Sequence, residues 1–151
     1  MNALAKKPTG PTAVSALQGA LAAEHAAVYG YGVIAAMVTG NAETMAKADW
    51  LAHQDARDTL EAMLVKLGAT PVAASPAYQL PFAVTGEASA ARLAAALEDG
   101  VTQAYLAVVA VTNRTLRSFG ALAMQAPANR ALAWGGSPVA FPGMPTTSTN
   151  T

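Results

Sequence analysis

The sequence predicts an all-α protein, an up-and-down bundle of four helices. Three observations support this prediction. Apolar residues recur every three or four positions in four long segments, alanine is abundant in each, and most prolines lie outside them. Hydrophobic residues make up 53% of the 151 residues, which is enough for one compact core. We expect the bundle over residues 13–134, a disordered segment at 1–12 and an extended Pro- and Thr-rich tail at 135–151.

The first predicted helix is opened by Pro11 and Thr12 and ended by Gly40 and Asn41. Its inward stripe has spacings of three and four and consists of Leu17, Leu21, Glu24, Val28 and Tyr31. Glu24 therefore lies within an apolar stripe and is expected inside the bundle. His25 lies about 100° further around the helix, so we expect it at the surface or at an interface.

The second predicted helix ends at Gly68. The same spacing of three and four residues predicts an inward stripe of six residues: Trp50, His53, Arg57, Leu60, Leu64 and Leu67. His53 and Arg57 should therefore point inward or toward a helix boundary. The simplest interpretation is an internal ion pair between Glu24 and Arg57, with His53 and tyrosine side chains completing the hydrogen bonds.

The third predicted helix begins near Ser89 and buries Leu93, Leu97, Val101, Ala104 and Val108. Glu98 lies at the edge of this stripe and should be half-buried. The fourth helix follows Asn113, and its inward residues are Leu116, Phe119, Ala123, Ala126, Arg130 and Trp134. Pro127 should kink or interrupt this helix. Short links within the two helix pairs imply antiparallel neighbours, whereas residues 71–86 form a longer, Pro-rich connection.

Composition excludes several classes of function. Nine Lys or Arg balance nine Asp or Glu, so no basic field would attract nucleic acid or an anionic membrane. The absence of cysteine excludes disulfides, zinc-thiolate sites and a cysteine nucleophile. No apolar run approaches the length of about 20 residues that a membrane span needs. We therefore expect a soluble, cytoplasmic protein with no nucleic-acid or membrane partner.

The residues suited to metal binding are Glu24, His53 and Glu98. A di-iron bundle takes one Glu from each of two helices and a Glu-x-x-His pair from each of the other two. Here the second helix has no Glu three residues before a His, and the fourth offers neither Glu, Asp nor His. The favoured interpretation is an internal polar network of Glu24, His53, Arg57 and Glu98 without a cofactor. The alternative is an iron or manganese site formed by Glu24, His53 and Glu98.

Aromatic residues and overall shape suggest two further possibilities. Tyr31, Trp50 and Tyr105 are candidates for lining a small-molecule pocket, although aromatic residues at helical spacing more often belong to a core. An uncharged, alanine-rich bundle also presents a flat apolar helix face for self-association. We therefore predict a homodimer.

Several segments together resemble a bacterial ferritin-like domain family of unknown function. They comprise residues 17–32, 53–57, 67–72 and 78–82, and the resemblance continues through the Glu98 helix to residues 141–143. It covers roughly residues 13–145 and implies a ferritin-like bundle, in which the long middle connection makes the second and third helices parallel. The interior of such bundles often carries two metal ions. Glu24 and Glu98 match the carboxylate positions of that site, and His53 is a weaker match.

Two functions therefore compete. The favoured one is a non-enzymatic binding or assembly module with a degenerate metal site. The alternative is a metal-dependent oxidoreductase, of the di-iron or di-manganese type, that uses Glu24, His53 and Glu98. Fold resemblance supports the architecture more than it supports either activity.

Overall fold

The computed structural model of the chain describes residues 10–139, 141 and 144. These residues contain helices and no strand, which confirms the all-α fold. The helices are α1 (Ala13–Ala35), α2 (Gly40–Lys66), α3 (Glu87–Val109), α4 (Arg114–Ala123) and α5 (Gln125–Ala133). None of them is long and apolar enough to cross a membrane. Residues 1–9 of the predicted disordered segment, and most of the predicted tail beyond residue 139, lie outside the described residues.

Capping residues mark the start of α1 and the end of α2, and glycine marks the link between these two helices. The Thr12 side chain accepts a hydrogen bond from the Ser15 backbone at the start of α1. The prediction that Gly40 ends the first helix is wrong, because α1 stops at Ala35 and Gly40 is the first residue of α2. Gly40 has a φ of 61°, a conformation that suits glycine at the tight link between the two helices. Gly68, with φ of 75°, follows α2 as predicted.

The fourth predicted helix is divided into α4 and α5 at Met124. Pro127 is the third residue of α5, where its missing N–H leaves no helical hydrogen bond unmade. A continuous helix would bring its ring against the carbonyl of Ala123, the last residue of α4. The predicted interruption is therefore present, and it lies three residues before the proline.

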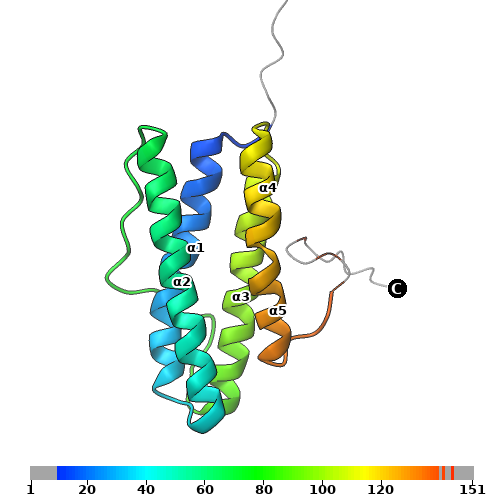
Figure 1. Cartoon of the computed structure of the whole chain (residues 1–151). Coiled ribbons are helices and arrows are strands. Elements are labelled where there is room, and N and C mark those ends of the chain that lie inside the picture. Colours follow the sequence, from blue (N-terminus) through cyan, green and yellow to red (C-terminus); the bar gives the residue numbers. More distant parts are fainter. Residues whose placement is uncertain (1–9, 140, 142–143, 145–151) are drawn as a thin grey trace, which may run out of the picture.

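The long helices lie side by side, and α2 and α3 begin at the same end of the molecule (Figure 1). The α1 helix packs against α2 and α3, and α3 also packs against α4 and α5. At Gly120 an added Cβ would lie 3.0 Å from the Val108 Cβ and 3.1 Å from the Val109 backbone nitrogen, so α3 and α4 approach closely.

The connection between α2 and α3 runs along α1. Near the start of the connection, the Gln18 side chain donates to the Thr70 carbonyl (2.7 Å) and accepts from the Val72 backbone N–H (2.8 Å). Further along, the rings of Tyr29 and Tyr78 lie 5.4 Å apart. The connection therefore follows α1 from its N-terminal half toward its C-terminal half and carries the chain back to the end where α3 begins (Figure 1).

The buried interior has two apolar clusters with charged residues between them. One cluster contains Leu17, Leu21, Leu60, Leu64 and Val108, and the other contains Ile34, Val38, Leu93 and Trp134. Three fully or almost fully buried polar residues lie midway along the helices: Glu24, His53 and Glu98. Buried charges are stable only when they are paired, so the contacts of these residues define the site.

Candidate functional site

His53 stands at the centre of the interior charges and joins two carboxylates. Its Nδ1 lies 2.6 Å from Glu24 Oε2, and its Nε2 lies 3.1 Å from Glu98 Oε1. Three different helices supply these residues, because Glu24 lies on α1, His53 on α2 and Glu98 on α3. A ring that faces a carboxylate on each side is best satisfied as an imidazolium that donates from both nitrogens.

Glu98 accepts hydrogen bonds from three groups at one oxygen. The Tyr31 hydroxyl donates to its Oε1 at 2.6 Å, and the Arg130 Nε donates to the same atom at 2.7 Å. His53 is the third donor. The other oxygen, Oε2, is buried and has no hydrogen-bond partner among the described residues. Glu98, expected to be half-buried, is completely buried.

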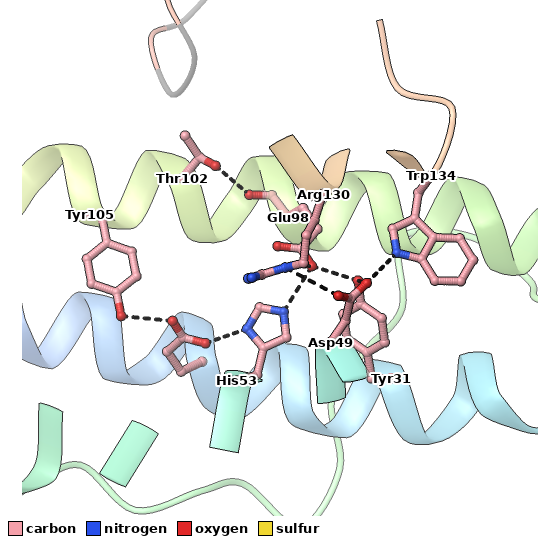
Figure 2. A network of polar contacts seen from close by, with 9 residues as sticks. Tyr31, Asp49, His53, Glu98, Thr102, Tyr105, Arg130 and Trp134 are labelled. Atoms are coloured by element: carbon pink, nitrogen blue, oxygen red, sulfur yellow. Dashed lines mark hydrogen bonds and ion pairs between the residues drawn. The ribbon is translucent and has the colours of Figure 1, made fainter. Parts of the chain in front are cut away.

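Asp49 and Trp134 extend the cluster toward the second apolar half. The Trp134 Nε1 donates to Asp49 Oδ2 at 2.8 Å, and the Arg130 Nε lies 3.9 Å from Asp49 Oδ1. On the opposite side, the Tyr105 hydroxyl donates to Glu24 Oε1 at 2.9 Å. We call the residues connected by these contacts the polar layer: Glu24, Tyr31, Asp49, His53, Glu98, Tyr105, Arg130 and Trp134. Figure 2 shows this network and labels all of these residues except Glu24.

The charges of the polar layer shift the pKa values of its members. Burial alone would lower the pKa of His53, but its hydrogen bonds with Glu24 and Glu98 outweigh burial and raise the pKa to about 9. Burial alone would raise the pKa of Glu98, yet hydrogen bonds from His53 and Arg130 lower it. Burial, ahead of the charges of Glu98 and Glu24, raises the pKa of Tyr31 and of Tyr105. At neutral pH the tyrosines therefore donate, and His53 and Glu98 are both charged.

Residues 16–146 match the model of a family described as a domain of unknown function (DUF4439). The chain belongs to this family. The DUF4439 chain is also similar to a solved structure, that of a conserved hypothetical protein, rv2844, from Mycobacterium tuberculosis. The two are 35% identical with a TM-score of 0.77, and the match covers 80% of this chain and 92% of that one. No curated protein matches the sequence.

The polar layer of this DUF4439 chain does not fit the metal ions that a ferritin-like bundle would imply. Both His53 nitrogens already face carboxylates, and a guanidinium contacts Glu98 where a cation would have to bind. Arginine stays protonated and repels a dication. Within the described part of the chain, no group of three or more His, Cys, Asp or Glu is arranged to hold a metal ion.

The predicted ion pair between Glu24 and Arg57 is wrong. Glu24 is paired with His53 and Tyr105, and the Arg57 guanidinium instead contacts the neighbouring Asp58, with Nη2 to Oδ1 at 2.7 Å. The Arg57 side chain lies at the boundary of the helix interface, where its long stem can carry the charge toward solvent. Arg130 on α5 is the arginine that enters the polar layer.

We therefore expect Arg57→Ala to change the free energy of unfolding by about 1 kcal/mol or less, the usual effect of an exposed ion pair. Chemical denaturation at neutral pH measures this. Arg130→Ala is the matched comparison, because it removes the same functional group from the polar layer and should cost several times more. Equal losses in the two variants would contradict this placement of the two arginines.

The three predicted pocket residues of the DUF4439 chain, Tyr31, Trp50 and Tyr105, do not line one common pocket. Tyr31 and Trp50 line one open depression of about 320 Å3 beside α1 and α2, and Tyr105 lines a different one. His25 is not a surface residue, because it is buried beneath the connection with its Nε2 3.0 Å from the Val72 carbonyl. Its contact with Glu61 is long, at 3.9 Å.

Sequence reasoning missed Asp49 and gave Arg130 and Trp134 no role in the site. Asp49 precedes His53 by four residues and therefore lies on the same face of α2. Arg130 and Trp134 belong to the predicted inward stripe of the fourth helix. The sequence did contain a signal for Arg130. This arginine lies in the apolar stripe of the fourth helix, and Glu24 and Glu98 lie in or beside the apolar stripes of two other helices, so a buried ion pair between these helices could have been expected.

Proposed function

We propose that this chain is a non-enzymatic binding module, a ferritin-like bundle whose metal site is degenerate. The observation that carries the proposal is the place of Arg130, whose Nε lies 2.7 Å from Glu98 Oε1. Together with His53, it brings two cations among the carboxylates of Glu24, Asp49 and Glu98. The positive charges of these two side chains then balance the buried carboxylates, as metal ions do in a metal-containing bundle.

One observation favours the competing function, a metal-dependent oxidoreductase that uses Glu24, His53 and Glu98. Glu98 Oε2 is buried without a partner among the described residues, and a buried carboxylate oxygen normally has one. A bound ion would satisfy it. A water molecule would do so equally well, and the two cations of the polar layer oppose the ion.

Elemental analysis of the full chain, purified without chelator, tests the proposal. We expect iron, manganese and zinc well below one ion per chain, and no tight binding when Fe(II) or Mn(II) is added without oxygen. The variant Arg130→Ala is informative, because a gain of metal binding there would support displacement of a metal ion by the guanidinium. Stoichiometric iron or manganese that is lost in Glu24→Ala would overturn the proposal in favour of the oxidoreductase.

The predicted homodimer and cytoplasmic location stay predictions. Apolar side chains for self-association are present on the surface of α4 and α5, where Leu122 and Leu132 are exposed. Exposed leucines in this number also occur on monomeric proteins.

A further inference from the structure

A slot leads from the surface to the polar layer between α2 on one side and α4 and α5 on the other. Its volume is about 240 Å3. Most of the walls are small or apolar: Ala52 and Ala56 come from α2 together with Thr59, and Phe119, Ala123 and Pro127 come from α4 and α5. Glu24, Tyr105 and Arg130 also line it, so the slot is apolar along its sides and polar where it meets the polar layer.

Arg130 lines this slot and has hydrogen-bond donors that no described residue uses. Its Nε is occupied by Glu98, but no described residue accepts a hydrogen bond from either terminal nitrogen of the guanidinium. The side chain is 20% exposed, and the slot is one place where that exposed part is found. A hydrogen-bond acceptor on a bound molecule would satisfy these N–H groups.

Glu24 offers the opposite chemistry in the same slot. Its Oε1 accepts from Tyr105 and its Oε2 accepts from His53, and a carboxylate oxygen can accept a second hydrogen bond. The residue is only 1% exposed, so a ligand donor that reached it would be shielded from water. Charge-assisted hydrogen bonds are stronger in such a setting.

The two charges together select a neutral head group. An anion would be attracted by Arg130 and repelled by Glu24, and a cation would experience the reverse. A carboxamide avoids both penalties, because its carbonyl can accept from a guanidinium while its N–H donates to a carboxylate.

We propose that the slot binds a small neutral molecule with an apolar body and a carboxamide head group, held between Arg130 and Glu24. The volume equals that of about eight liquid waters, which fits a single ring or a short branched chain. This inference rests on the proposed function, since a metal-containing interior would have a different charge.

Three probes that share one ring test the head-group preference: benzamide, benzoate and benzylammonium. Each is titrated into the full chain while amide chemical shifts are followed by NMR. For so small a ligand we expect a Kd on the order of millimolar for benzamide, with the two ions at least about tenfold weaker. Shifts should be largest at residues of α2, α4 and α5 that line the slot. Tighter binding of either ion, or no binding of benzamide, would overturn the proposal.

Filling the slot provides an independent test. Ala56→Leu places a larger side chain in the wall and should abolish benzamide binding, whereas Ala62→Leu, an identical change at an exposed position of α2, should not. If Ala56→Leu fails to fold, Ala126→Leu replaces it, because Ala126 lines the slot and is exposed. Benzamide binding unchanged by a folded slot-filling variant would contradict the assigned site.

Elemental analysis distinguishes failure of the carboxamide site from failure of the proposed function. Protein that contains no metal and does not bind benzamide would disprove the carboxamide site and leave the binding module standing. Protein that contains stoichiometric metal would disprove the proposed function, whatever the result with benzamide.

Discussion

Glu98→Ala should destabilise the protein by about 3–5 kcal/mol, the usual cost of removing one partner of a buried charge pair. The carboxylate is fully buried and accepts from His53, Tyr31 and Arg130 at a single oxygen. Its removal leaves His53 Nε2 and Arg130 Nε without a hydrogen-bond acceptor, and leaves the Tyr31 hydroxyl only the longer contact of 3.4 Å with Asp49 Oδ2. Urea unfolding at pH 7, with the same slope required in wild type and variant, measures the loss.

Two variants serve as controls for this prediction. Asp99→Ala removes a carboxylate from the next position of α3, which is exposed, and should cost well under about 1 kcal/mol. Glu98→Gln keeps an oxygen that can accept the hydrogen bonds but removes the charge, so its loss should lie between the other two. Similar losses for Glu98→Ala and Asp99→Ala would show that the polar layer does not depend on this carboxylate.

Stability should fall as the pH rises from about 6.5 to about 9. The pKa of His53 is raised to about 9 in the folded protein, against 6.5 for an ordinary histidine. A raised pKa means that the folded state holds the proton more tightly, so the stabilisation is complete below 6.5 and lost through pH 9. Since one pKa unit corresponds to about 1.4 kcal/mol, the loss should be about 3 kcal/mol. Urea unfolding at intervals between pH 6 and 10 measures it.

The two histidines of the chain permit a matched comparison. His53→Gln should be less stable than the wild type at pH 6. Between pH 6.5 and 9 its free energy of unfolding should fall much less than that of the wild type. His25→Gln, which changes the histidine beneath the connection, should keep that decline. A wild-type stability that stays flat over this range would show that His53 is not protonated between Glu24 and Glu98.

Periodicity predicted the helices well because an inward stripe depends only on residues close in sequence. It placed Glu24 and His53 inside for the same reason. It also placed Arg57 inward or at a helix boundary, and the boundary is where this side chain lies. The predicted pairing of Arg57 with Glu24 was wrong, because a long side chain at a boundary position can turn either inward or outward. The link around Gly40 was misassigned because a glycine and asparagine pair is a common end signal, whereas here glycine begins the next helix.

The partners within the polar layer could not be read from spacing. Arg130 and Glu98 lie on different helices, and Trp134 and Asp49 are 85 positions apart in the sequence. Which residues meet depends on how far each helix extends and on where α4 gives way to α5. Pro127 showed that an interruption was due, but the place of the interruption depends on the steric conflict with Ala123.

The polar layer also limits how the helices can slide past one another. Alanine-rich faces are smooth, so shifting one helix along its neighbour by a turn, about 5.4 Å, would still bring apolar surface against apolar surface. Such a shift would carry His53 away from Glu24 and Glu98, which lie on two other helices, and leave all three charges buried and unpaired. The interior charges therefore allow one axial alignment where the alanines alone would permit several.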